Sequence, residues 1–196
     1  MLSDSDRAQA PVIYRGPIRS GGADSGFEEG FTVKRIPESG LVFLDPVPPE
    51  AVEIYQDKAY WSNRYGSDEG IDFEAIRSKL EPEQLQWLER IGRQNFEDRI
   101  VADIGAGSGL FLNLISGIAS ATIGIELSQS MLRQLKKDGH EARAAIGEVA
   151  DRSVDVCVTF DVLEHSLDPI AFLSDANRVL KKGGKLYVAF PIKTIS

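Results

Sequence analysis

The second half of the chain alternates short apolar strands with helices. After Asp98, segments with the composition of buried strands are separated by segments with helical periodicity. The expected strands are 100–104, 121–126, 142–146, 154–160 and 186–190, and the expected helices are 109–118, 129–138 and 169–180. Such alternation is typical of parallel sheets, because right-handed crossovers place the helices on the sheet faces. We predict an α/β fold with a Rossmann-like, doubly wound and mostly parallel sheet.

The first of these strands runs directly into a glycine-rich turn. Residues 103–109 read DIGAGSG, so that Gly105, Gly107 and Gly109 alternate with other residues. Glycine lets the backbone turn sharply and lets a ligand approach the main chain closely, although strand-to-helix turns also use glycine for steric reasons alone. The dinucleotide fingerprint G-x-G-x-x-G would need glycine where Leu110 stands. The spacing therefore argues against a nicotinamide cofactor.

Two carboxylates flank this turn. Asp103 precedes it, and Glu126 ends the second strand, roughly 20 positions beyond Gly105, where dinucleotide folds place the acidic residue that binds ribose. A carboxylate there can accept both ribose hydroxyls, and an exposed charge that merely ends a strand is the alternative. Negative charge at Asp103 suits a cationic ligand better than a pyrophosphate. The pattern favours S-adenosylmethionine as the ligand.

Two further stretches complete a set of motifs. Residues 155–165 read DVCVTFDVLEH, and residues 178–186 read RVLKKGGKL. Together with the glycine turn and Glu126, in this order, they resemble the class I S-adenosylmethionine-dependent methyltransferases over about residues 98–192. The chain is most similar to the small-molecule type, which acts on sugars, quinone precursors and related metabolites. The resemblance implies an enzyme that transfers a methyl group to a small metabolite or sugar.

The resemblance also implies which residues bind the cofactor. The turn residues would line its methionine and ribose portion, Glu126 would accept the ribose hydroxyls, and Leu127 and Met131 would pack beside adenine. The full expected set is Asp103, Gly105, Ala106, Gly107, Gly109, Glu126, Leu127, Met131, Glu148, Phe160 and Asp161.

The remaining members of this set lie further along the chain. Glu148, after the third strand, would reach the adenine edge, and Phe160 and Asp161 would close the site near the sulfonium. His165 is the candidate catalytic residue, as a general base toward a substrate hydroxyl or, with Glu164, as a ligand of a divalent metal. A structural histidine just after the fourth strand is the alternative.

Three parts are expected along the chain. Residues 1–30 are rich in Ser, Asp, Gly and Pro and carry too little apolar surface to offset ordering entropy, so they are interpreted as a flexible arm. Residues 31–97 are expected to form a hairpin and a helical lid. Residues 98–196 would be the cofactor-binding core.

Within the middle part, the hairpin is expected to pair 31–36 with 41–44. A helix is expected at about 50–56. Because Pro82 suits a first helical turn, two helices rather than one are expected between 72 and 96.

A weaker resemblance covers the hairpin. Relatives often carry a cysteine-bearing zinc element here, but Ile36 and Ser39 stand where cysteines would be expected, so packing alone should hold the hairpin. Cys157 is the single cysteine, which excludes an intrachain disulfide and a cysteine-rich zinc site, and no metal is expected. Tyr60 and Trp61 would form an aromatic lid over a sulfonium or belong to the core.

Composition limits the partners. The net charge of -8 and the pI near 4.9 argue against nucleic-acid binding, which draws affinity from Lys and Arg contacts to phosphate. The start of the chain is polar, and no run approaches the roughly 20 apolar residues that span a bilayer, so a cytoplasmic protein without membrane contact is expected.

The expected sheet has five strands, whereas the family's sheet has seven. The apolar strand 186–190 would form an uncovered edge, which makes homodimerisation through that edge an expectation. The alternative to an enzyme is a non-catalytic or truncated module of the same fold that binds the cofactor or a partner.

Overall fold

A five-stranded parallel sheet forms the centre of the protein. The structure, a computed structural model, describes residues 4–19, 27–28, 30–46, 61, 65–67 and 70–190. The strands are β8 (Ile100–Ile104), β9 (Ala121–Ile125), β10 (Glu141–Arg143), β11 (Val154–Phe160) and β12 (Leu180–Ala189). They lie side by side in the order β10-β9-β8-β11-β12, and all of their pairings are parallel. From β8 the chain adds β9 and β10 on one side and then β11 and β12 on the other. This order confirms the Rossmann-like fold.

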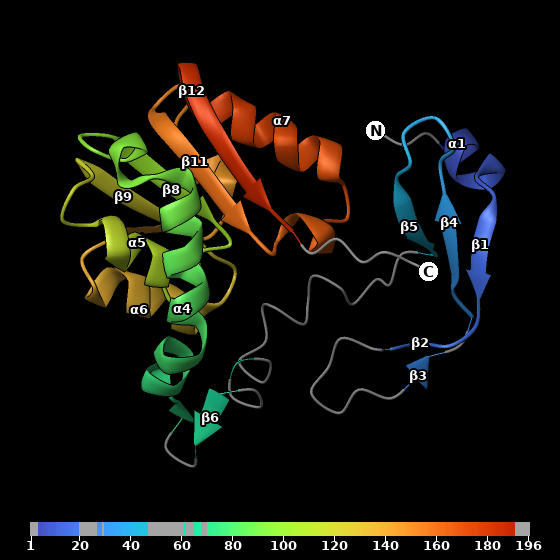
Figure 1. Cartoon of the computed structure of the whole chain (residues 1–196), viewed down its shortest axis with the longest axis horizontal. Coiled ribbons are helices and arrows are strands. Elements are labelled where there is room, and N and C mark those ends of the chain that lie inside the picture. The colour runs from blue at the N-terminus through green and yellow to red at the C-terminus, as the bar shows by residue number, and fades with distance from the viewer. Residues whose placement is uncertain are drawn as a thin grey trace.

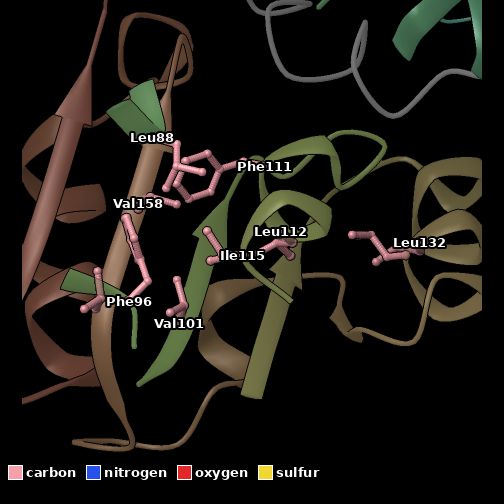
Figure 2. Packing of buried hydrophobic residues seen from close by; sticks show 10 residues of the cluster. Leu88, Phe96, Val101, Phe111, Leu112, Ile115, Leu132 and Val158 are labelled. Atoms are coloured by element: carbon pink, nitrogen blue, oxygen red, sulfur yellow. The ribbon is translucent and has the colours of Figure 1, made fainter. Parts of the chain in front are cut away.

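Three helices cover one face of this sheet (Figure 1). They are α4 (Phe73–Ile91), α5 (Leu110–Ile115) and α6 (Gln129–Lys137). Figure 2 shows Phe111 of α5 beside Leu88 of α4 and Val158 of β11, all in one buried cluster. The ring of Phe96 meets Phe111 edge to face at 5.4 Å. This layer supports the helix that follows the glycine turn.

The opposite face packs against α7 (Pro169–Val179). Ala176 and Val179 of α7 are fully buried against residues of β8, β9 and β11. Asp168 caps this helix, because its Oδ1 accepts hydrogen bonds from the N–H groups of Ile170 and Ala171. Cys157 is fully buried in the same layer, which agrees with a core role.

Two strands differ in length from the prediction by more than one residue. β10 ends at Arg143 rather than at 146, because the chain turns into the 3₁₀ helix Ile146–Glu148. β12 begins at Leu180 rather than at 186, because β11 already pairs with it there, with an irregularity between Val154 and Val156.

The region between 72 and 96 forms one long helix instead of two. α4 continues through Pro82, so the prediction of a break there is wrong. A proline inside a helix leaves the carbonyl four residues earlier without its N–H partner. That carbonyl belongs to Ser78, which is exposed, so water can satisfy it. The short 3₁₀ helix Arg93–Asn95 follows α4, and the helix expected at 50–56 lies outside the described residues.

A small antiparallel sheet precedes the core. β4 (Thr32–Arg35) and β5 (Val42–Asp45) form the expected hairpin, and β1 (Val12–Arg15) pairs with the other side of β4. Residues of β1 therefore belong to a sheet rather than to a flexible arm. The other short elements before α4 are α1 (Asp4–Gln9), β2 (Ile18–Arg19), β3 (Phe27–Glu28), β6 (Gly66–Ser67) and β7 (Gly70–Ile71).

An ion pair holds the hairpin in addition to packing. Lys34 Nζ lies 2.5 Å from Asp45 Oδ2 and also donates to the carbonyl of Arg7. Thr32 Oγ1 donates to the carbonyl of Asp45. These contacts join β4, β5 and the start of the chain.

Within the part of the chain that the structure describes, no helix is both long enough and apolar enough to cross a membrane.

Replacing Phe111 by alanine should lower the free energy of unfolding by about 3–5 kcal/mol, because it leaves a cavity between α4, α5 and β11. Urea unfolding followed by circular dichroism measures the change. Leu85→Ala is the control, since Leu85 is 44% exposed and its loss should cost under about 0.5 kcal/mol. Equal losses for the two variants would contradict this description of the core.

Candidate functional site

The candidate site lies where β8, β9 and β11 end together. Asp103 is in register with Gly124 of β9 and with Val158 of β11. Glu126 and Asp161, which follow those strands, are therefore at the same edge of the sheet as the glycine turn. In open α/β sheets this edge is where ligands bind.

The three glycines of the turn differ in what a side chain at their position would contact. Gly105, Gly107 and Gly109 all have positive φ, a conformation that favours glycine. A Cβ at Gly105 would lie 2.3 Å from Val162 Cγ2, and a Cβ at Gly109 would lie 2.7 Å from Leu135 Cδ2. These two glycines allow the protein to pack against the turn. A Cβ at Gly107 would meet only Trp61 among the described residues, at an ordinary 3.6 Å, so of the three glycines Gly107 has the most open space beside it.

The carboxylate of Glu126 braces the turn against α6. Its Oε2 accepts from the N–H of Gly107 at 2.9 Å, and its Oε1 accepts from the N–H of Ser128 at 2.9 Å. Ser128 occupies the N-cap position of α6, but its own side chain makes no capping hydrogen bond. Glu126 therefore satisfies the helix start and fixes the turn at the same time.

Asp103 and Glu126 form a buried acidic pair. They are 4% and 8% exposed. Burial, and next the charge of Glu126, raise the pKa of Asp103 to about 7. Burial also raises the pKa of Glu126, while its hydrogen bonds from Ser128, Gly107 and Leu127 oppose that shift. Two carboxylates held this way favour a ligand that brings positive charge or hydrogen-bond donors.

A buried histidine supports the turn from behind. His140 Nε2 lies 2.9 Å from Asn113 Oδ1, and its Nδ1 lies 2.7 Å from Thr122 Oγ1. Because Asn113 Nδ2 donates to Asp138, its Oδ1 must accept, so Nε2 of His140 carries the proton. Burial lowers the pKa of His140, which favours the neutral ring. The sequence offered no signal for this role, because its partners come from different elements.

The residues expected beside adenine have different environments. Leu127 is 41% exposed at the end of β9. Met131 is fully buried against Leu110, Ile76 and Tyr65. Glu148 is exposed, and its Oε2 accepts from the N–H of Ala144 at 3.3 Å.

The residues after β11 divide between core and surface. The ring of Phe160 stacks on Trp87 at 5.6 Å and meets Phe111 edge to face at 5.0 Å, so it packs into the α4 and α5 layer. Asp161 is exposed with a φ of 54°, and its N–H donates to the carbonyl of Ala189. His165 is exposed, with its Nε2 3.9 Å from Glu164 Oε1.

Trp61 packs in the core and lies beside the glycine turn. It stacks on Tyr65 at 6.1 Å and joins the cluster of Met131, and it is also the neighbour of Gly107. Tyr60 lies outside the described residues. Among the residues that the structure describes, no group of three or more His, Cys, Asp or Glu side chains is arranged to hold a metal ion.

Comparison with known proteins agrees with this geometry. Residues 102–188, which include the turn, Glu126 and β11, match the family described as a methyltransferase domain. These residues form a class I methyltransferase domain. A probable S-adenosylmethionine-dependent methyltransferase of Mycolicibacterium smegmatis is 33% identical over 98 residues, which is 47% of this chain and 38% of that protein. The cofactor of this family is S-adenosylmethionine.

Other relatives of the methyltransferase domain have related names. A ubiquinone biosynthesis O-methyltransferase of Parvibaculum lavamentivorans is 28% identical over 111 residues, 51% of this chain and 43% of that protein. An uncharacterized 37.1 kDa protein in a transposon of Streptomyces fradiae is 33% identical over 164 residues, 78% of this chain and 42% of that protein. The chain thus spans about two fifths of the length of these relatives.

Solved methyltransferase structures match part of the chain. A possible histamine N-methyltransferase from Thermotoga maritima is 26% identical, with 58% of this chain and 52% of that chain covered and a TM-score of 0.48. A methyltransferase described as putative from Methanococcus maripaludis is 18% identical, with 59% of each chain covered and a TM-score of 0.49. The strand order β10-β9-β8-β11-β12 of this chain itself defines the fold of the methyltransferase domain.

Replacing Asp103 by asparagine should stabilise the ligand-free protein near and above neutral pH. A carboxyl whose folded pKa is about 7 instead of 3.8 contributes stability that is present below pH 3.8 and is lost as the pH rises through 7. The introduced amide does not titrate. The free energy of unfolding of Asp103→Asn relative to that of the wild type should therefore increase by at least about 1 kcal/mol from pH 5 to pH 8.

Urea unfolding at several pH values measures this gain. Asp98→Asn is the matched control, because Asp98 is exposed and asparagine tolerates its φ of 56°. A difference between Asp103→Asn and the wild type that stays constant from pH 5 to pH 8 would refute the buried charge pair.

Proposed function

We propose that the protein is an S-adenosylmethionine-dependent methyltransferase that methylates a small metabolite or sugar. The observation that carries this proposal is the buried pair of Asp103 and Glu126 on either side of a turn whose Gly107 has open space beside it among the described residues. The methyltransferase domain match over residues 102–188 supports it.

Glu126 is suited to bind the ribose of the cofactor. An ionised carboxylate has about four lone-pair sites, and the N–H groups of Gly107, Ser128 and Leu127 use three of them. The remaining site can accept a hydroxyl hydrogen bond while these three contacts stay in place. The carboxylate is therefore suited to accept from the ribose of an adenosyl ligand, and hydrogen bonds within the protein orient it.

Asp103 complements positive charge. Its raised pKa means that deprotonation is unfavourable in the ligand-free protein below about pH 7. A cation bound beside the turn would favour the carboxylate form, since an opposite charge lowers a carboxyl pKa. The amino group or the sulfonium of the cofactor would supply that charge.

The chain's main task is alignment and proton removal. When bound, S-adenosylmethionine would supply an activated methyl group to the acceptor's electron pair, with the electrons of the broken carbon–sulfur bond left on sulfur. The turn and Glu126 fix the donor side, and Asp161 lies at the same edge of the sheet for the acceptor side. If the acceptor is a hydroxyl, a base must take its proton. A role for His165 as that base stays a prediction.

The acceptor class follows from charge and from the relatives. The net charge of -8 disfavours a nucleic-acid acceptor. Relatives named ubiquinone biosynthesis O-methyltransferases support a hydroxyl group on a small molecule as the acceptor.

Calorimetric titration with S-adenosylmethionine and S-adenosylhomocysteine tests the proposal. The wild type should bind both at micromolar to low millimolar concentration, and Glu126→Ala should weaken binding about tenfold or more, because it removes the ribose acceptor and the brace. Glu89→Ala, an exposed acid on α4, is the control and should bind as the wild type does.

Absence of binding of both ligands to the wild type would refute the function. A transfer assay over hydroxylated metabolites and sugars then separates an enzyme from a module that binds the cofactor without methylating anything. Binding without transfer would favour the module.

We also propose a homodimer through the edge of β12. Val188 on this strand and Phe190 beyond it are exposed large hydrophobic residues, 36% and 49%. Among the described strands β12 lies at the edge of the sheet, so a second strand added along it would pair with its outward main-chain groups and cover these side chains. Light scattering should give a dimer mass that Val188→Lys reduces to that of a monomer. A wild type that stays monomeric at high concentration would contradict the dimer.

A further inference from the structure

Four hydrogen bonds form one chain of side chains behind the glycine turn. Thr122 Oγ1 lies 2.7 Å from Nδ1 of His140, and Nε2 of His140 lies 2.9 Å from Asn113 Oδ1. Asn113 Nδ2 donates to Asp138 Oδ2 at 3.2 Å, and Gln134 Nε2 donates to the other carboxylate oxygen of Asp138 at 2.8 Å. This hydrogen-bond chain joins β9, α5 and α6.

The donors of the hydrogen-bond chain all point toward the carboxylate of Asp138. A carboxylate only accepts, so the amide of Asn113 must present its Nδ2 to Asp138 and its Oδ1 to His140. His140 then donates from Nε2, and its Nδ1 accepts from the hydroxyl of Thr122. Hydrogen bonds in series strengthen one another. The neutral ring is therefore held in one tautomer and one orientation.

The imidazole ring is also in contact with the turn itself. A Cβ at Gly109 would lie 3.4 Å from Cδ2 of His140 and 2.7 Å from Cδ2 of Leu135. His140 and Leu135, which are 5% and 0% exposed, thus line the same side of Gly109. The N–H of His140 donates to the carbonyl of Leu135 at 3.0 Å, which holds the two residues together. The position of the ring consequently limits where the backbone of Gly109 can lie.

Asn113 carries the same constraint into α5. Its N–H donates to the carbonyl of Gly109 at 2.8 Å, and the N–H of Gly109 donates to the carbonyl of Ala106 at 2.9 Å. The side chain of Asn113 is bonded to His140 while its main chain is bonded to the turn. A shift of the imidazole would therefore reach Gly109 by two routes, one through direct contact and one through Asn113.

We propose that His140 is a positioning residue for cofactor binding, an inference that rests on the proposed function. It acts through Gly109 and Asn113 rather than on the ligand. By fixing Gly109, it keeps the N–H of Gly107, two residues earlier, against the carboxylate of Glu126. Supporting residues must hold a binding site within about 0.5 Å of its productive geometry, and loss of that support lowers affinity. His140 thus contributes to cofactor affinity as well as to stability.

Calorimetric titration with S-adenosylhomocysteine tests this role. His140→Leu keeps a buried side chain that neither donates nor accepts, so it should weaken binding about fivefold or more. His140→Gln, whose amide offers one donor and one acceptor as the neutral ring does, should bind within about twofold of the wild type. Asn113→Leu should weaken binding as His140→Leu does, and the double variant should lose no more than either single variant, because each breaks the same hydrogen-bond chain.

Val179→Ala separates positioning from general stability. Val179 is fully buried in the layer of α7, on the opposite face of the sheet. The substitution leaves a cavity and should lower the melting temperature, as His140→Leu does. It should nevertheless bind S-adenosylhomocysteine as the wild type does, because it touches neither the turn nor the hydrogen-bond chain. Thermal melting of both variants provides the comparison.

Hydrogen exchange of the ligand-free protein supplies a readout that does not depend on binding. In His140→Leu the amides of residues 105–113 should exchange about tenfold or more faster than in the wild type, because Gly109 and Asn113 lose their support. In Val179→Ala these amides should keep their wild-type rates. If His140→Leu does not fold, Asn113→Leu still tests the hydrogen-bond chain by both measurements.

The possible outcomes separate this inference from the function on which it rests. Wild-type affinity in His140→Leu, or a loss of affinity in His140→Gln or Val179→Ala as large as that in His140→Leu, would overturn the role of His140. Unchanged exchange over residues 105–113 in His140→Leu would overturn it as well. Each of these results, with wild-type binding intact, leaves the methyltransferase function standing. A wild type that binds neither S-adenosylmethionine nor S-adenosylhomocysteine would refute both.

Discussion

The carboxylate of Glu126 is the contact on which the arrangement of the site depends. It accepts one hydrogen bond from Gly107 in the turn after β8 and one from Ser128 at the start of α6. The ends of two neighbouring strands are thereby held by one side chain that is 8% exposed. Both hydrogen bonds are made within the protein, so they limit the mobility that a ligand would otherwise have to restrict.

This order is accompanied by electrostatic strain. Asp103 and Glu126 are buried close enough for the charge of one to raise the pKa of the other. Burial of like charges opposes folding, and natural sites often keep such strain where a ligand relieves it. The neutral network of His140 behind the turn supplies rigidity there without adding a third charge.

The sequence was sufficient where structure is local and insufficient where distant segments decide it. Strand β8, the turn and Glu126 follow from hydrophobic patterning and from spacing, and the parallel pairing of the strands follows from their alternation with helices. Pro82 was expected to break α4, but the helix continues through it, with Ser78 at an exposed position. The packing of Gly105 against Val162 and the hydrogen bonds of His140 to Asn113 and Thr122 involve residues far apart in the chain, and no local pattern signals them.

The contact between Gly105 and Val162 has a consequence for how the two substrates of the proposed enzyme would bind. Val162 belongs to the segment after β11, and no side chain at position 105 separates it from the backbone of the turn. A displacement of that segment by a bound acceptor would therefore act directly on the backbone of the turn. In the proposed enzyme the two substrates would therefore influence each other's affinity through a single methyl-to-backbone contact.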